Sequence, residues 1–158
     1  MDVAAGEGNA AVTLADHVAT SGVRMTCFVA AGDGLMAEKL GARGHEVAWL
    51  GLPTARRLDA TPLPAGVVVR GAPSLRVRYW RPVGAGPTAA ELELARILGF
   101  RLVAPTVTIG LDADPDGRNP VATDIVRVPV GLAPARLASW LGDAERRAIE
   151  LVPVSAVG

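Results

Sequence analysis

The chain has 158 residues, which suits one domain with a substantial core, and we expect a single domain over residues 1–158. Basic and acidic side chains balance at 16 each, which argues against broad electrostatic capture of nucleic acid or of an anionic membrane. The single cysteine excludes an internal disulfide framework and a zinc site made of several cysteines.

Helical and strand patterns alternate along the chain. Leu14 and Val18 lie four residues apart and predict a helix over 10–20. The stretch from Val23 to Ala31 is apolar nearly throughout, as a strand buried on both faces would be. The remaining predicted elements are a helix over 35–43, a strand over 45–50, a hairpin over 66–70 and 75–80, a helix over 86–98, a strand over 101–111 that bends or splits at Pro105, a strand over 123–130 and a helix from Pro134 onward.

This order of elements predicts the fold class. Alternating helices and strands are typical of α/β proteins in which crossover helices cover a mostly parallel sheet. We therefore expect an α/β, three-layer, Rossmann-like sandwich with a mostly parallel sheet and a hairpin at its edge. The first residues show no signal-peptide pattern, and no apolar run reaches the ~20 residues that span a bilayer, so a soluble, cytoplasmic protein is predicted.

A ligand site is expected where the strands end. In a parallel sheet the loops that follow the strands meet at one edge, and ligands bind there. The helices that begin near Leu35 and Pro87 point their free amide groups toward the same edge. The candidate cofactor-binding residues are Gly32, Asp33, Gly34, Gly84, Gly86, Thr88 and Thr106, and the sequence does not identify the cofactor.

The segment Gly32-Asp33-Gly34 allows two interpretations. It lies between a strand and a helix, where dinucleotide-binding proteins carry G-x-G-x-x-G, and it resembles those Rossmann units. Ala37 stands at the third glycine position, however, and the carboxylate of Asp33 would lie beside a pyrophosphate. A nucleotide-binding loop and a tight turn both stay open.

Cys27 is the candidate catalytic residue. A thiolate nucleophile needs a base or a positive field close by. His17 lies late in the first helix and His45 at the start of the second strand, and neither position is next to Cys27 in a parallel arrangement. The sequence therefore favours a buried structural thiol over a nucleophile.

The unit from Val23 to Val47 resembles the strand-Cys-loop-helix-strand element of caspase-like cysteine peptidases, in the degenerate form found in very large actinobacterial proteins. The segment from Leu75 to Thr106 is similar to the same element without its cysteine. The resemblance implies the nucleophile position for Cys27 and a His-Gly pair before the cysteine strand. Arg70-Gly71 stands in place of such a pair, so the resemblance implies a catalytically inactive relative.

The loop from Asp112 onward is a candidate metal site. Asp112, Asp114 and Asp116 begin a D-x-D-x-D-G pattern that is typical of a calcium loop. The twelfth position is Thr123 instead of glutamate, and Pro115 stiffens the loop. A cation site and a solvated turn therefore both stay open.

One cluster combines basic and aromatic side chains. Arg76, Arg78 and Arg81 surround Tyr79 and Trp80. Such a cluster can clamp an anion between guanidinium groups and rings. Alternating arginines can equally form the solvated face of an edge strand, which resists aggregation.

These patterns together predict a soluble α/β binding or interaction module without a catalytic constellation of its own. Its predicted partner is a small molecule, a protein or a second copy of the chain in a homo-oligomer, and neither nucleic acid nor a membrane. The alternative is an enzyme whose site lies at the strand-end edge. That enzyme would be nucleotide-dependent through the 32–34 loop, or a hydrolase that uses Cys27.

Overall fold

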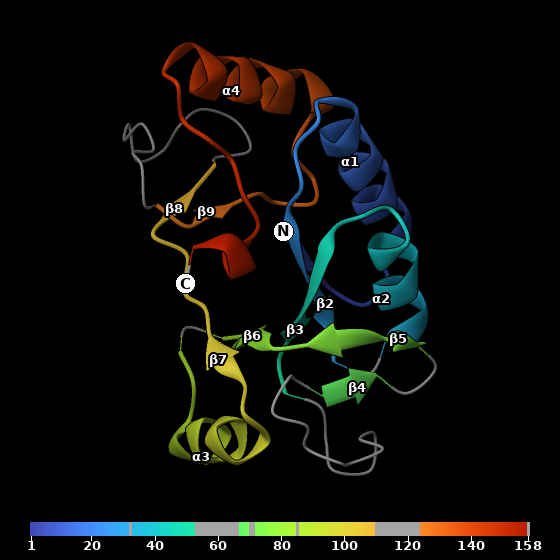
Figure 1. Cartoon of the computed structure of the whole chain (residues 1–158), viewed down its shortest axis with the longest axis vertical. Helices are drawn as coiled ribbons and strands as arrows, with labels where there is room; N and C mark the ends of the chain where they lie inside the picture. Colours follow the sequence, from blue (N-terminus) through green and yellow to red (C-terminus); the bar gives the residue numbers. More distant parts are fainter. Residues whose placement is uncertain (32, 53–66, 70–71, 85, 110–123, 158) are drawn as a thin grey trace.

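The computed structural model describes residues 1–31, 33–52, 67–69, 72–84, 86–109 and 124–157, of which 67–69 and 72–76 are described by their backbone alone. Its centre is a five-stranded sheet in the order β1-β2-β3-β6-β7, and every pairing in it is parallel (Figure 1). The strands are β1 (Asp2–Val3), β2 (Thr26–Ala30), β3 (Glu46–Leu50), β6 (Tyr79–Arg81) and β7 (Arg101–Leu102). Because the strands share one direction, their carboxyl ends lie at a common edge.

The side chains of the sheet alternate between its two faces. One face packs against helices and carries Cys27, Val29, Val47, Trp49 and Trp80. The opposite face carries a second apolar cluster of Phe28, Ala48, Tyr79 and Val103. Full burial of an apolar side chain of this size contributes about 1.5–3 kcal/mol to the free energy of unfolding. The two faces therefore need apolar residues at nearly every position, which explains the continuous apolar runs in the sequence.

Helices α1 (Gly8–Thr20) and α2 (Gly34–Gly41) cover the helix-facing side of the sheet (Figure 1). The buried residues of α1 are Ala11, Leu14, Ala15 and Val18, whose spacing of three to four residues forms one apolar stripe. Helix α2 begins where Asp33 Oδ1 accepts a hydrogen bond from the amide of Met36 at 3.1 Å. Both helices were predicted from the sequence to within two residues at each end.

Helix α3 (Ala89–Leu98) has a strong signal at each end. The Thr88 hydroxyl oxygen accepts a hydrogen bond from the Glu91 amide, and the Glu91 carboxylate accepts one from the Thr88 amide. Gly99 ends the helix at φ +72°, a left-handed conformation that favours glycine. The helix predicted over 86–98 begins three residues later than expected, because Thr88 is its cap. Strand β7 begins two residues after Gly99.

The predicted hairpin is present, although its second strand begins and ends three residues earlier than expected and the hairpin is not an edge of the main sheet. Strands β4 (Val67–Val69) and β5 (Ala72–Val77) pair in the antiparallel sense, apart from the main sheet. The single strand predicted over 75–80 is divided, because the chain enters the main sheet again at β6. Tyr79 and Trp80 are buried on opposite faces of that sheet, which the hairpin alone would not achieve.

The second half of the chain completes the molecule. Strands β8 (Val107–Thr108) and β9 (Val126–Arg127) form a parallel pair, and the predicted break at Pro105 separates β7 from β8. Helix α4 (Pro134–Arg146) buries Leu137 and Ala144 and lies near α1 in Figure 1. The 3-10 helix η2 (Val154–Ala156) brings Val154 onto the second face of the sheet.

The α/β class with a mostly parallel sheet in a three-layer arrangement is therefore confirmed. Strand β1 was not predicted, because two residues give no periodicity to recognise. Among the described residues, no helix combines the length and the hydropathy that crossing a bilayer requires.

Candidate functional site

The carboxyl edge of the main sheet is where parallel α/β proteins place their ligand-binding and catalytic side chains. In the described residues this edge is largely apolar. Strand β1 is followed by Ala4 and Ala5, β2 by Ala31, and β3 by Gly51 and Leu52. Further along these loops, the polar side chains of Glu7 and Asp33 accept hydrogen bonds from backbone amides.

Three charged side chains meet beside this edge. Arg81, the last residue of β6, places Nη1 2.9 Å from Oδ1 of Asp2 in β1. Arg127 of β9 places Nε 2.9 Å from Oδ2 of the same carboxylate. We name Asp2, Arg81 and Arg127 the Asp2 cluster. One carboxylate thus joins the main sheet to the β8–β9 pair.

The Asp2 cluster is partly shielded from water. The side chains of Asp2 and Arg81 are 13% and 14% exposed, whereas that of Arg127 is 42% exposed. The guanidinium carbon of Arg81 lies 5.9 Å from the centre of the Phe28 ring, within the range of a cation–π contact. Two guanidinium groups face one carboxylate, so the cluster keeps one positive charge.

Sequence reasoning found only part of this cluster. Arg81 was predicted as an anion clamp or as the solvated face of a strand, together with Arg76 and Arg78. The structure separates two of these residues. Arg78 is exposed and lies between β5 and β6 in the chain, whereas Arg81 points at Asp2. Asp2 was missed because it lies 79 positions away from Arg81, and no local pattern connects them.

Among the described residues, Cys27 is not part of a catalytic arrangement. Its side chain is completely buried on the helix-facing side of the sheet. Burial raises the pKa of the Cys27 thiol to about 11, so the thiol is protonated near neutral pH. A thiolate nucleophile requires the opposite shift. Cys27 therefore acts as a small apolar residue of the core.

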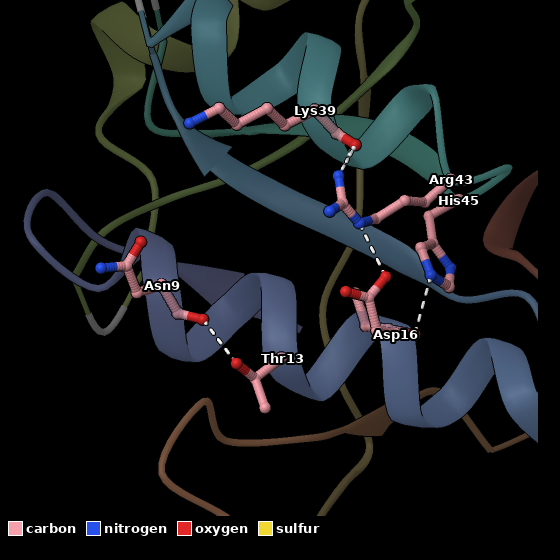
Figure 2. A network of polar contacts seen from close by, with 7 residues as sticks. Asn9, Thr13, Asp16, Lys39, Arg43 and His45 are labelled. Atoms are coloured by element: carbon pink, nitrogen blue, oxygen red, sulfur yellow. Dashed lines mark hydrogen bonds and ion pairs between the residues drawn. The ribbon is translucent and has the colours of Figure 1, made fainter.

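His45 is a structural histidine in the network of Figure 2. Its Nδ1 accepts a hydrogen bond from the amide of Met25 at 3.4 Å, and its Nε2 donates one to the carbonyl oxygen of Ala15 at 3.1 Å. Burial lowers the pKa of His45 below its usual 6.5. Both ring nitrogens are occupied, so the ring is not a base for Cys27. The Asp16–Arg43 ion pair at 2.7 Å links α1 to the end of α2 beside it.

Two of the seven candidate cofactor-binding residues serve as helix caps. Asp33 and Thr88 both accept hydrogen bonds from helix amides, and those amides are therefore not available to a phosphate. Gly34 is the buried first residue of α2. Side chains at Gly84 and Gly86 would meet open space, so no close approach requires glycine there. Gly32 lies outside the described residues.

Thr106 also has a structural role. Its hydroxyl donates a hydrogen bond to Asp124 Oδ1 at 2.8 Å and accepts one from the amide of Ile125 at 3.0 Å, which ties β8 to β9. The predicted metal residues Asp112, Asp114 and Asp116 lie outside the described residues. Within the described ranges, no three His, Cys, Asp or Glu side chains gather as a metal ion would require.

A cavity of about 370 Å³ lies away from the carboxyl edge. Its lining includes Met25 and Thr26 at the start of β2, Ile125 beside β9, and Leu137 and Trp140 of α4. This volume is in the range of small-molecule pockets. The cavity lies near the amino ends of β2 and β9, and no sequence signal indicated it.

Comparison with known proteins rests on the fold. No protein-family profile and no curated protein sequence matches this chain. Among solved structures it is similar to a family 4 carbohydrate esterase pseudoenzyme from Bacillus anthracis, with 10% identity and a TM-score of 0.69 over 98% of this chain. A mutant of that pseudoenzyme with restored activity matches at a TM-score of 0.70. The chain spans 63–65% of the length of these structures.

Two deacetylases show the same likeness. The Bc1960 peptidoglycan N-acetylglucosamine deacetylase is 11% identical, with a TM-score of 0.69 over 98% of this chain and 85% of its own. The Bacillus cereus polysaccharide deacetylase Bc1974 is 12% identical, with a TM-score of 0.66 over 96% of this chain and 89% of its own. At these identities the likeness establishes a shared fold.

The shared fold corrects two predictions. The resemblance to caspase-like peptidases is wrong, because the structures that match are carbohydrate esterases and polysaccharide deacetylases. The same finding overturns the prediction of a self-associating binding or interaction module, together with its nucleotide-dependent and cysteine-hydrolase alternatives. The buried Cys27 and the capped helix ends supply the physical reason, since in the described part of the chain they leave neither a thiolate nor a phosphate cradle.

Proposed function

We propose that this chain is a protein of the carbohydrate-esterase fold that is directed at acetylated polysaccharides. The observation that carries the proposal is the match over 98% of the chain, at TM-scores of 0.69–0.70, to proteins of this esterase family. One of these proteins is named for peptidoglycan and another for polysaccharide in general. The acetyl group is the chemistry that these substrates share.

The Asp2 cluster is a feature of this chain that also supports the proposal. Polysaccharides present hydroxyl, acetamide and ring oxygens, all of which accept hydrogen bonds. Arg127 is 42% exposed and brings guanidinium donors to the edge where ligands of parallel sheets bind. The hydrolytic step requires activation of a water molecule, and the proposal assigns recognition rather than that step to Arg127.

Recognition without hydrolysis is the second candidate, and one specific observation favours it. Three of the matching structures are of a single family 4 pseudoenzyme, in its native and mutant forms. The described strand ends of this chain include the apolar Ala4 and Ala5 after β1. On this view the fold holds an acetylated polysaccharide and leaves it intact.

One experiment separates the two candidates. The purified chain is incubated with insoluble peptidoglycan and with chitin, and bound protein and released acetate are measured, with and without added divalent cations. Chitosan, which keeps the chain of chitin without its acetyl groups, is the matched control. Retention on the acetylated polymers with acetate release supports the hydrolase, and retention without release supports the second candidate. Equal retention on chitin and chitosan, or none on either acetylated polymer, would overturn the proposal.

The predicted cytoplasmic location stays a prediction, which fractionation of cells tests directly. The predicted absence of nucleic-acid and membrane partners also stays a prediction, and it rests on the balance of 16 basic and 16 acidic residues.

A further inference from the structure

The Asp2 cluster holds more positive charge than its own carboxylate neutralises. Arg81 and Arg127 share Asp2, and among the described residues neither arginine has an ion pair with another carboxylate. Asp2 and Arg81 are largely removed from water, where an uncompensated charge is costly. A cluster of this kind therefore favours an additional anion.

The hydrogen-bonding pattern points in the same direction. Nε of Arg81 is buried and has no hydrogen-bond partner in the described part of the chain. Nε of Arg127 lies 2.9 Å from Asp2 but lacks hydrogen-bond geometry. Buried donors in folded proteins are nearly always paired. The Nε of Arg81 is therefore an unsatisfied donor, and the Nε of Arg127 is held only by its ion pair with Asp2.

We propose that Arg81 and Arg127 bind the carboxylate of an acidic sugar unit. The inference rests on the proposed function and narrows its substrate class to acetylated polysaccharides that also carry carboxylates. A planar guanidinium group matches a carboxylate in a two-point contact. The single positive charge left in the cluster matches the single negative charge of a carboxylate.

The position of the cluster suits such a ligand. Arg81 ends β6 at the carboxyl edge of the sheet, and the exposed part of Arg127 is open to solvent. Phe28 packs against the guanidinium group of Arg81 and helps to hold it in place. A sugar carboxylate can therefore reach Arg127 first, with Arg81 behind it.

The first test uses monosaccharides, so that it does not depend on a polymer. Binding of glucuronate is measured by titration calorimetry, with glucose as the neutral match and sodium chloride at equal ionic strength as the salt control. We expect glucuronate to bind and glucose not to bind, and Arg127→Gln to weaken glucuronate about tenfold or more. Arg101→Gln removes the same charge from exposed β7 and should leave the affinity unchanged.

A second variant, Asp2→Asn, tests the inference if Arg127→Gln alters folding. Asp2→Asn removes the competing carboxylate and should tighten glucuronate binding, provided that its circular dichroism spectrum stays native. A merely structural role of Asp2 would predict weaker binding or no change. Equal affinity for glucuronate and glucose, or equal effects of Arg127→Gln and Arg101→Gln, would overturn the inference.

Polymers then distinguish this inference from the proposed function. If chitin is retained as well as acetylated polyuronate, and Arg127→Gln affects neither, the proposed function stands and the carboxylate site falls. If glucuronate binds in an Arg127-dependent manner while no acetylated polymer is retained, the carboxylate site stands and the proposed function falls. Preference for the acetylated polyuronate that Arg127→Gln abolishes supports both.

Discussion

Nε2 of His45 lies 3.1 Å from the carbonyl oxygen of Ala15, which ties the start of β3 to the middle of α1. Nδ1 of the same ring accepts the amide hydrogen of Met25 at 3.4 Å. The ring is therefore neutral, with its proton on Nε2. A second proton would have to break the contact with Met25, and burial opposes the charge as well.

The free energy of unfolding should therefore depend on pH through His45. Its pKa is lowered in the folded state, so below pH 6.5 the unfolded chain binds the proton more readily than the folded one. Stability from this group is complete above that pH, is lost as the pH falls below it, and levels off below the folded-state pKa. Urea unfolding between pH 7.5 and 5 should show the decline, and His45→Gln should flatten it. A decline of equal slope in His45→Gln would contradict this role, and His17→Gln, measured in parallel, is the matched control.

Asp2 and Arg81 should be strongly coupled. Removing one partner of a shielded ion pair leaves the other charge unpaired, at a cost of about 3–5 kcal/mol when burial is complete and less at the 13–14% exposure seen here. A double-mutant cycle with Asp2→Asn and Arg81→Gln should give a coupling free energy of about 1–3 kcal/mol. The cycle with Arg127→Gln should give less, because that side chain is 42% exposed. Equal coupling free energies in the two cycles would show that the burial of the arginine does not determine the strength of its ion pair with Asp2.

Cys27 should react slowly in the folded protein. Its thiol is completely buried and its pKa is raised to about 11 by burial. A disulfide reagent such as DTNB at pH 8 should therefore label it only as fast as the chain opens, and at once in denaturant. Labelling of the native protein at the rate of an exposed thiol would refute the burial. It would also reopen the question of a reactive cysteine.

Thr26 should hold the C-terminal segment on the sheet. Its hydroxyl donates to Glu46 Oε2 and accepts the amide of Val154 at 2.8 Å. Thr26→Val keeps the shape of the side chain but leaves the amide of Val154 unpaired. It should therefore lower the free energy of unfolding by about 1–2 kcal/mol. Hydrogen exchange should accelerate at Val154. Thr20→Val, in an exposed helix end, is the control and should change neither quantity.

The elements that the sequence predicted well are those with local causes. Leu14 and Val18 reveal α1 by their spacing, and Gly99 marks the end of α3 because few other residues adopt its backbone conformation. The division of the strand over 75–80 has no local cause. It depends on Trp80 pairing with Trp49, a partner that lies 31 positions earlier in the chain.

The site was predicted less well for the same reason. Asp33 and Thr88 were expected to bind a ligand because both stand before helices, and they do stand there, but as caps. A capping side chain and a phosphate-binding loop give the same local pattern, so sequence alone does not separate them. The partner of Arg81 depends on which strand ends lie side by side, and Asp2 in a two-residue strand gave no sign of its place.

Two glycines should respond to alanine with opposite signs. Gly99 has φ +72°, and a β-carbon there would meet nothing within 4 Å, so Gly99→Ala tests backbone strain alone. We expect Gly99→Ala to lower the free energy of unfolding by about 1 kcal/mol. Gly142 lies inside α4 without positive φ, and its β-carbon would meet Arg146 only at an ordinary 3.5 Å. Gly142→Ala should therefore stabilise the protein by about 0.5–1 kcal/mol, because glycine in a helix loses more backbone entropy on folding. Thermal and urea unfolding of the two variants beside the native chain measure both signs, and a change of the same sign in both would show that φ does not decide the outcome.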